Sequence, residues 1–334
     1  MAVQAASTAP GPAGPPAVEQ VCSAGARLSM PFPVRVNPAL EAVQDGSLDW
    51  AEAHGIAAGE RLDWIRRSEI NRLTALTNPF ARSDDLRLIN DWYVWLYAFD
   101  DGVCDESAVG SAPARLSALA IELNLALDGG GEPAGGAFGS ALADLATRIA
   151  RAAPLCGWPQ SVRDYLCGQL WECAYKAAGT VPGPRAYTRL REFSSACASV
   201  FTLLGIANGR PLPPALLDRP PVAELVRCAN HIIGWDNDLY SYPKEQGDHD
   251  ALANIVTVLQ RHHGCPVEEA VERVLARRET ELRRFLAVER RLCRRGPDPD
   301  TAVLIRGLKH WISGSLEFHR TSPRFRSSAR GAAD

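Results

Sequence analysis

Apolar side chains recur at the spacing of an α-helix along almost the whole of this chain. The stretches GERLDWIRRSEINRLTALT, SDDLRLINDWYVWLYAFDD and SALADLATRIARA show the pattern clearly. Proline and glycine separate such stretches, and we find neither the alternating pattern of a β-strand nor a short internal repeat. The sequence therefore predicts an all-α fold of roughly ten helices in a single domain, many of them buried because they are apolar on more than one side.

Composition and charge limit the partners that the chain can have. Its 334 residues are 46% hydrophobic, which is enough for a large core, and the formal net charge is only −3. Because such a balance provides no strongly basic surface, we expect no nucleic-acid partner. No run of about 18 apolar residues occurs, which predicts no membrane span. The nine cysteines are odd in number and irregularly spaced, so we expect free thiols and a cytoplasmic protein.

The two ends of the chain differ in composition from the rest. Residues 1–25 are rich in alanine, proline and glycine, and they lack the basic start and the apolar run of a signal peptide. We therefore expect a disordered tail over residues 1–25, a helical domain over residues 26–326 and a second disordered tail over residues 327–334.

The segment NDLYSYPKE places three oxygen-bearing side chains four residues apart, at Asn237, Ser241 and Glu245. A helix advances about 3.6 residues per turn, so this spacing stacks the three groups along one face. Amide, hydroxyl and carboxylate oxygens suit hard cations such as Mg²⁺. From this segment alone, a solvated polar helix face is an equally good interpretation. Pro243 lies inside the segment and predicts a local distortion that leaves the direction of Glu245 open.

A second acidic segment, FDDGVCDE, follows the long aromatic stretch. Asp100 and Asp101 end the predicted helix, and Asp105 comes about one and a half turns later. Carboxylates crowded at the end of an apolar helix repel one another unless a cation neutralises them. An ordinary helix end with an acidic turn is the alternative. If a second oxygen-bearing helix faces this one, a magnesium site between the two explains both segments.

Together, the two segments resemble the metal-binding motifs of class I terpene synthases, particularly the bacterial sesquiterpene cyclases. DDGVCD is similar to the aspartate-rich motif in its DDxxxD variant, and NDLYSYPKE matches the family pattern N-D-[LIV]-x-S-x-x-K-E at every position. The likeness runs from PFPVRVNP near residue 31 to the Arg-Phe pair at residues 324–325. It implies the isoprenoid-synthase helical bundle, a single domain around a central apolar cavity, and a small prenyl diphosphate as the substrate.

The resemblance implies Mg²⁺ ions, three in number, bound on both sides of that cavity. Asp100 would bridge ions on one side, with weaker support from its two acidic neighbours. The implied ligands are Asp100, Asp101 and Asp105 on one side and Asn237, Ser241 and Glu245 on the other.

The resemblance also implies residues that sense the diphosphate. The family has an arginine 46 residues before the motif asparagine, and counting back from Asn237 reaches Arg191 rather than the competing Arg189. Ser194 then takes the family's linker position. Ser195 takes the position at which a helix break presents a backbone carbonyl to the substrate.

Further diphosphate contacts are implied at the end of the NDLYSYPKE segment and near the C-terminus of the chain. Lys244 would contact the diphosphate directly. The family ends in an Arg-Tyr pair that binds diphosphate on closure, whereas this chain has Arg324 and Phe325. Phenylalanine has no hydroxyl to donate, so that one contact stays open. The pair His319 and Arg320 is a weaker candidate for the same role.

The carbocation left after loss of diphosphate needs a dry pocket. Aromatic faces stabilise such a cation by about 1–2 kcal/mol or more each when desolvated. The expected lining residues are Tyr93, Leu96, Tyr97, Phe99, Val200, Phe318 and Phe325. Ordinary core packing is the alternative for each single aromatic side chain, and we identify no general base.

The implied function is Mg²⁺-dependent ionisation and cyclisation of a linear prenyl diphosphate. Chain length favours farnesyl diphosphate and a cyclic sesquiterpene product. The small residues Ser195 and Val200 keep a diterpene cyclase acting on geranylgeranyl diphosphate as the main alternative, ahead of a monoterpene cyclase. A chain-elongating prenyltransferase would carry a second aspartate-rich motif, and a class II cyclase would carry DxDD. A non-catalytic helical scaffold leaves both polar clusters unexplained, and the oligomeric state stays open, with a homodimer as one alternative.

Overall fold

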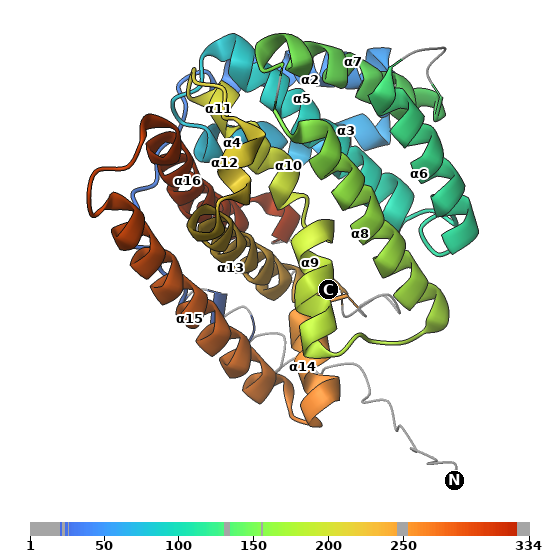
Figure 1. The fold of residues 1–334 in the computed structure, drawn as a ribbon. Coiled ribbons are helices and arrows are strands. Elements are labelled where there is room, and N and C mark those ends of the chain that lie inside the picture. Colours follow the sequence, from blue (N-terminus) through green and yellow to red (C-terminus); the bar gives the residue numbers. More distant parts are fainter. Residues whose placement is uncertain are drawn as a thin grey trace.

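The structure, a computed structural model, describes residues 21, 24–25, 27–129, 134–154, 156–245 and 253–325. Over these residues it consists of helices and loops without a β-strand, which confirms the predicted all-α fold (Figure 1). The helices are α2 (Leu40–Ala53), α3 (Glu60–Arg67), α4 (Ile70–Thr77), α5 (Ser83–Phe99), α6 (Pro113–Asp128), α7 (Gly136–Ala152), α8 (Trp158–Ala178), α9 (Pro184–Ser194), α10 (Cys197–Thr202), α11 (Leu204–Ala207), α12 (Pro214–Asp218), α13 (Pro220–Glu245), α14 (Ile255–His263), α15 (Val267–Cys293) and α16 (Pro299–Thr321), with a π-helical turn η1 (Asp100–Asp105) and a 3-10 turn η2 (Pro323–Phe325).

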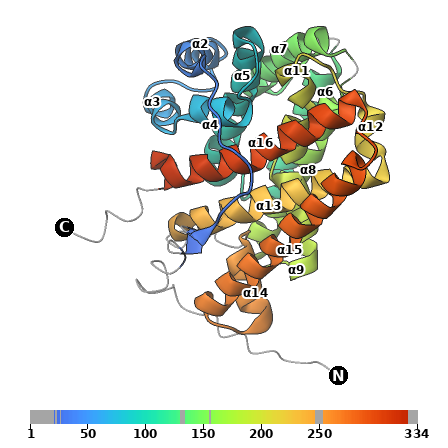
Figure 2. The same cartoon turned by 90° about the vertical axis from the view of Figure 1, so that its left-hand side faces the viewer.

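Helices α13 and α16 cross the middle of the molecule. Figure 2 shows them between α2, α5 and α7 on one side and α9, α14 and α15 on the other. Helix α13 packs against α9, α14, α15 and α16. Its C-terminal end, which carries NDLYSYPKE, is therefore held by neighbours on several sides.

Two residues with left-handed backbone separate successive helices: one lies inside GERLDWIRRSEINRLTALT, which periodicity predicts as continuous, and the other lies at the break that the resemblance implies near Ser195. Glu69, with φ of 55°, separates α3 from α4, and Ala196, with φ of 57°, separates α9 from α10. A side chain in this conformation costs roughly 1–3 kcal/mol, so neighbouring contacts must hold it there. These breaks and the unpredicted helix α2 raise the number of helices in the described residues above the roughly ten expected.

The core is built on aromatic side chains of α5. Trp92 and Trp95 stack with ring centroids 5.2 Å apart, and Phe99 stacks on Trp95 at 4.8 Å. All three are fully buried, and burial of a large apolar side chain stabilises a fold by about 1.5–3 kcal/mol. Because these rings fix one face of α5 in the core, Tyr93 and Tyr97 on another face are free to line a different space.

Residues near the N-terminus pack against the end of α13. Val21 and Ala24 are buried in a cluster that includes Leu239. Of the two expected tails, residues 1–20, 22–23 and 327–334 lie outside the described residues. The limits of the domain therefore stay a prediction.

The sequence also predicted that the chain has no membrane span and that its cysteines are free thiols. Within the described ranges, none of the helices combines the length and the apolar character needed to cross a bilayer. The eight cysteines of those ranges are free thiols. The cytoplasmic location stays a prediction.

Two buried carboxylates that are not among the predicted metal ligands are neutralised by arginines. Asp91 on α5 accepts hydrogen bonds from Arg87 (2.7 Å) and from Arg148 on α7 (2.8 Å). Asp236 on α13 pairs with Arg278 on α15, and both side chains are buried. Removing one partner of such a pair leaves an unpaired buried charge, which costs about 3–5 kcal/mol. The pairs therefore fix α5 and α13, the two helices that lead into the acidic and the oxygen-bearing segments.

Helices α4 and α16 approach each other closely at Gly314. A Cβ atom at this position would lie 2.6 Å from the carbonyl oxygen of Leu76 and 3.1 Å from the amide nitrogen of Thr77. Both are backbone atoms, so no side-chain rotation can make room. This contact sets the position of the α16 turn that carries Ser315 and His319.

We expect Gly314→Ala to lower the melting temperature, because one of the two helix backbones must move. A loss of about 1–3 kcal/mol in the free energy of unfolding is typical of such overpacking. Gly183→Ala is the control, since Gly183 has ordinary backbone angles (φ −64°, ψ 158°) and an added Cβ would meet nothing within 4 Å. Thermal unfolding followed by circular dichroism measures both variants. Equal melting temperatures would contradict the close contact.

Candidate active site

Two connected chambers lie between α5, α8, α9, α13 and α16. The inner chamber is the more apolar, and the outer chamber is polar; their empty volumes are about 840 and 1120 Å³ when space open to solvent is counted. Both chambers are lined by Asp100, Arg191, Ser194, Asn237 and Arg324. At this boundary, a polar group in the outer chamber would meet an apolar chain in the inner one.

The aspartate cluster lies on the π-helical turn η1, which follows α5. A π turn bonds residue i to residue i+5, as the amide of Glu106 does with the carbonyl of Asp101 (3.1 Å). This wider turn brings the carboxylates of Asp100, Asp101 and Asp105 within 4.8 Å of one another. The acidic turn expected from the sequence is thus a compact cluster.

Asp100 is the member of the cluster that faces both chambers. Its pKa is raised to about 8, first by burial and then by the nearby carboxylates, that of Asp105 foremost. Its Oδ1 accepts hydrogen bonds from the Tyr165 hydroxyl and from Gln169 Nε2, both at 3.2 Å. A cation beside Asp100 would favour its charged form, because burial and like charges both oppose that form at present.

Internal cations pair with the other two carboxylates. Arg324 makes a two-point ion pair with Asp101 (2.7 and 2.8 Å), and Lys176 Nζ lies 3.0 Å from Asp105 Oδ1. Asp105 is exposed and lines the outer chamber, whereas Asp101 is buried and borders neither chamber. The carboxylate of Asp101 therefore faces Arg324 rather than the open space, although the sequence predicted it as a metal ligand.

The opposite wall of the outer chamber is the C-terminal end of α13. Asn237, Ser241 and Glu245 all line this chamber, in agreement with their stacking on one helix face. Helix α13 continues through Pro243 to Glu245, so the proline does not turn that carboxylate away. Glu245 Oε2 accepts a hydrogen bond from Asn254 Nδ2 (2.9 Å), and burial raises its pKa to about 7.

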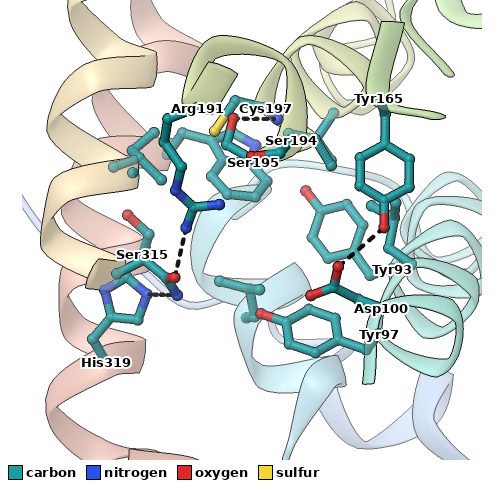
Figure 3. Close-up of a pocket in the computed structure, with 18 of the residues that line it drawn as sticks. Tyr93, Tyr97, Asp100, Tyr165, Arg191, Ser194, Ser195, Cys197, Ser315 and His319 are labelled. Atoms are coloured by element: carbon teal, nitrogen blue, oxygen red, sulfur yellow. Dashed lines mark hydrogen bonds between the residues drawn. The ribbon is translucent and has the colours of Figure 1, made fainter. Parts of the chain in front are cut away.

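Arg191 reaches the boundary of the chambers from α9, on the side opposite Asp100 (Figure 3). Its Nη2 donates to Asn237 Oδ1 (2.8 Å) and its Nε donates to Asp238 Oδ1 (3.1 Å). Burial alone would lower the pKa of Arg191, but Asp238 and other anionic neighbours raise it above its ordinary value. Arg191 is therefore a fixed, permanently charged group.

Sequence analysis did not single out Asp238. This carboxylate is buried, and besides Arg191 it accepts hydrogen bonds from the Tyr187 hydroxyl (2.6 Å) and the Ile255 amide (3.2 Å). Its one sign in the sequence is its place directly after Asn237 in the motif. One position along a helix turns a side chain toward different neighbours, so Asp238 bonds to Arg191 and Tyr187 of α9, and it also borders the outer chamber.

The helix break expected at Ser195 is present. Helix α9 ends at Ser194, α10 begins at Cys197, and the left-handed Ala196 lies between them. Ser194 and Ser195 both line the inner chamber (Figure 3). The Ser195 hydroxyl accepts from the Cys197 amide (3.3 Å) and donates to Asn230 Oδ1 (3.2 Å). The break is therefore a defined hydrogen-bonded turn beside the chamber.

The inner chamber has an aromatic and aliphatic wall. Of the predicted lining residues, those that border it are Tyr93, Leu96, Tyr97 and Val200. Phe99 and Phe318 border neither chamber: Phe99 packs against Trp95 and Phe138 in the core, and Phe318 is fully buried with its ring edge-on to Phe325. Further lining residues that sequence analysis missed are Leu73, Tyr165, Cys197, Ile233, Trp311 and Ser315.

The C-terminal residues close one side of the outer chamber. Phe325 lines it and packs edge-on to His319, with ring centroids 5.0 Å apart. Burial and the charge of Arg324 lower the pKa of His319 to about 3, so this imidazole is neutral. Arg320 donates to the carbonyl of Leu28 and borders neither chamber. Arg324 is thus the cation that the C-terminal segment supplies to the boundary.

Two exposed cations near the site differ in their position. Lys244 lines the outer chamber. Arg189 pairs with Glu192 and lies over the ring of Phe193 at 4.5 Å, outside both chambers. The geometry therefore agrees with the choice of Arg191 over Arg189.

Comparison with known proteins places this geometry in a family. The family model described as terpene synthase family 2, C-terminal metal binding, matches residues 91–284, more than half of the chain. A 4-epi-cubebol synthase from Streptosporangium roseum is 33% identical over 309 residues, which cover 91% of this chain and 93% of that protein. The chain belongs to the class I terpene synthases.

Other proteins resemble this terpene synthase over similar lengths. A (+)-T-muurolol synthase from Roseiflexus castenholzii is 33% identical over 310 residues, covering 90% of this chain and 93% of that protein. The crystal structure of the SVS_A2 protein from ancestral sequence reconstruction matches with a TM-score of 0.82 and 29% identity, covering 88% of this chain and 89% of that one. Both relatives of 33% identity are named as enzymes that cyclise (2E,6E)-farnesyl diphosphate.

The side chains of this terpene synthase fit a divalent metal. The outer chamber is lined by the oxygens of the predicted ligands Asp100, Asp105, Asn237, Ser241 and Glu245, and by those of Glu106, Gln169, Glu172 and Asp238. Sets of oxygen donors suit Mg²⁺ rather than zinc or copper. The raised pKa values of Asp100 and Glu245 show two buried carboxylates that lack sufficient positive charge nearby.

We expect Asp238→Asn to lower kcat/KM roughly 100-fold, because Arg191 loses the charge that orients it. The free energy of unfolding should fall by about 3 kcal/mol, since a buried guanidinium is left without its partner. Steady-state kinetics and chemical denaturation measure the two effects. Tyr187→Phe is the control: it removes one hydrogen bond to the same carboxylate, which is worth about 1.5–3 kcal/mol, and it leaves the charge of Asp238 in place to orient Arg191. Wild-type kinetics in Asp238→Asn would contradict this role.

Proposed function

We propose that this terpene synthase ionises farnesyl diphosphate, cyclises the resulting cation to a sesquiterpene and releases diphosphate. The observation that carries the proposal is the junction of the chambers, where a polar space lined by oxygen donors and cations opens into an apolar one. The two relatives of 33% identity named as farnesyl diphosphate cyclases support the choice of substrate.

The outer chamber is suited to a diphosphate. Mg²⁺ ions, three in this proposal, would be held by Asp100 and Asp105 on one wall and by the motif oxygens of α13 on the other, and they would neutralise the leaving group. Arg191, Lys244 and Arg324 line the same space and add positive charge. Because negative charge develops as the diphosphate departs, cations fixed in advance lower that barrier by about 3–4 kcal/mol per good contact.

Asp101 has a different role in this proposal. Its carboxylate holds Arg324 through two hydrogen bonds and does not border the chamber. It therefore orients a diphosphate-binding cation, as Asp238 does for Arg191. A metal ion would take its direct ligands from the other two aspartates of the cluster.

The inner chamber is suited to the prenyl chain and its cation. The rings of Tyr93, Tyr97 and Trp311 line it, and each aromatic face stabilises a desolvated cation by about 2 kcal/mol. Leu96 and Val200 complete an apolar surface that keeps water from the cation. The contour of this wall sets how the chain folds before ring closure.

Chain elongation and a larger substrate are the competing functions. An elongating prenyltransferase would need acidic side chains in place of Asn237 and Ser241. Geranylgeranyl diphosphate competes more strongly as a substrate, because Ser195 and Val200 are small residues in the chamber wall. Both chambers are complete within one chain, so the site does not require a homodimer.

The proposal predicts a cyclic sesquiterpene from farnesyl diphosphate and Mg²⁺, and no product after chelation of the metal. Geranyl and geranylgeranyl diphosphates are assayed beside it, with gas chromatography and mass spectrometry of the products. Asp100→Ala and Asn237→Ala should each lower turnover at least about 100-fold. Asp84→Ala, at an exposed aspartate in the first turn of α5, should not. Turnover of geranylgeranyl diphosphate alone would overturn the substrate, and metal-independent turnover would overturn the mechanism.

We also expect Phe325→Tyr to leave turnover unchanged or to raise it a few-fold. Phe325 already lines the outer chamber, and a phenol at this position adds a hydroxyl that can donate to a diphosphate oxygen. Steady-state kinetics with farnesyl diphosphate and inhibition by inorganic diphosphate measure the effect. A collapse of turnover would show that this ring has a different role.

A further inference from the structure

The C-terminal end of α9 leaves carbonyl groups that the helix itself cannot satisfy. An α-helix ends with four carbonyls that have no partner in the next turn, and here these belong to residues 191–194. The amide of Ser195 bonds to the carbonyl of Arg191 (3.2 Å), and the amide of Ala196 bonds to that of Phe193 (3.3 Å). In a continuous helix the amide of Ala196 would bond to the carbonyl of Glu192, but here it bonds to that of Phe193. The carbonyls of Glu192 and Ser194 therefore need donors from elsewhere.

Two buried side-chain amides supply those donors from opposite sides. Asn230 Nδ2 on α13 donates to the carbonyl of Glu192 (3.0 Å), and Gln169 Nε2 on α8 donates to the carbonyl of Ser194 (3.4 Å). Asn230 is only 5% exposed and Gln169 only 3%. Burial of a polar amide is unfavourable unless its hydrogen bonds are made. Their presence here is explained by the two carbonyls that the break exposes.

Each amide also makes a second contact toward the site. Gln169 Nε2 donates to Asp100 Oδ1 (3.2 Å), and Asn230 Oδ1 accepts from the Ser195 hydroxyl (3.2 Å). An amide nitrogen carries two hydrogens, so one Gln169 nitrogen can serve both Asp100 and the carbonyl of Ser194. The aspartate cluster and the helix break are thereby joined through a single side chain.

Backbone packing at the neighbouring residue shows that α8 lies directly against the break. A Cβ atom at Gly168 would lie 2.5 Å from the amide nitrogen of Ser194 and 2.8 Å from its Cα. Only glycine allows this approach, and it places the following residue, Gln169, within reach of both its acceptors. The contact is thus built into the backbone and does not depend on one rotamer.

We propose that Gln169 and Asn230 are positioning residues that clamp the break between α9 and α10, and that Gln169 couples the position of the break to Asp100. The inference rests on the proposed function, because the break is useful only if a prenyl cation forms beside it. Asn230 borders neither chamber, whereas Gln169 lines the outer chamber beside Asp100. Each acts through the backbone of residues 192–195, which borders the inner chamber at Ser194 and Ser195.

The test uses Gln169→Met and Asn230→Leu, which keep side-chain size and remove the donors. Asn208→Leu is the matched control, because Asn208 Nδ2 also donates to a helix carbonyl, that of Leu204 (2.8 Å), away from both chambers. With farnesyl diphosphate and Mg²⁺, kcat should fall about 10- to 100-fold in the two clamp variants while KM stays within about threefold. The product mixture should shift toward acyclic and early-quenched products. The double variant should lose less than the product of the two single losses.

Binding of Mg²⁺ with inorganic diphosphate, measured by calorimetry, separates positioning from binding. Its Kd should stay within about threefold of wild type in Asn230→Leu, because Asn230 borders neither chamber. Gln169→Met should weaken this binding severalfold, because Gln169 lines the outer chamber and bonds to Asp100. A parallel loss of affinity and kcat in Asn230→Leu would overturn the positioning role. Wild-type kcat and products in both folded variants would also overturn it.

Isosteric variants keep the test decisive if the apolar ones do not fold. Asn230→Asp still accepts from Ser195 but cannot donate to the carbonyl of Glu192, and Gln169→Glu loses both donated bonds. These variants should show the same fall in kcat and the same product shift. If the wild-type enzyme turns over no prenyl diphosphate, both the proposed function and the clamp fail. If it does, and the variants behave as wild type, only the clamp fails.

Discussion

Repulsion among the three carboxylates of η1 is the constraint around which the site is arranged. They lie within 4.8 Å of one another, and the pKa of Asp100 is raised to about 8. Like charges in a buried position are tolerated only beside cations. Arg324 pairs with Asp101 and Lys176 with Asp105, whereas the direct hydrogen bonds to Asp100 from the described residues come from the neutral Tyr165 and Gln169. The charge of Arg324 offsets only part of the effect of burial and like charges on Asp100, which faces both chambers.

Metal binding between η1 and α13 requires a fixed distance between these two walls of the outer chamber. Asp100 and the oxygens of α13 face the same space from opposite sides, so a cation between them would interact favourably with both walls. Each wall is also tied to a helix behind it, because Asp91 joins α5 to α7 and Asp236 joins α13 to α15. Buried ion pairs of this kind are weak evidence for extra stability, but breaking them is costly. Here they fix the positions of the two helices that carry the facing oxygens.

The sequence alone specified the parts of this site that depend on local spacing. Three oxygens four residues apart on α13 share a face in any helix, so Asn237, Ser241 and Glu245 line one chamber whatever the packing. The all-α fold followed from periodicity for the same reason. Arg191 was found by its distance from Asn237, which the family resemblance supplied and the residues alone did not.

The parts that the sequence did not specify depend on how helices rotate and where backbones bend. Phe99 was expected in the cavity and packs in the core, whereas Trp311 was missed and lines the inner chamber. Both outcomes are set by the rotation of α5 and α16, which a periodic pattern leaves open when a helix is apolar on several sides. The left-handed Ala196 is likewise held by tertiary contacts, and Gln169 and Asn230 have no local pattern that reveals them.

The two arginines of the boundary are already bonded, yet their geometry leaves room for a substrate. A guanidinium has about five N–H donors in one plane. Asp101 takes one bond from each of two nitrogens of Arg324, and Asp238 and Asn237 take one each from Arg191. Donors therefore remain on both side chains while the protein anions hold their planes in place. An anion entering the outer chamber meets oriented donors rather than mobile ones, so little reorganisation is needed when charge develops on it, which is the condition for strong electrostatic stabilisation.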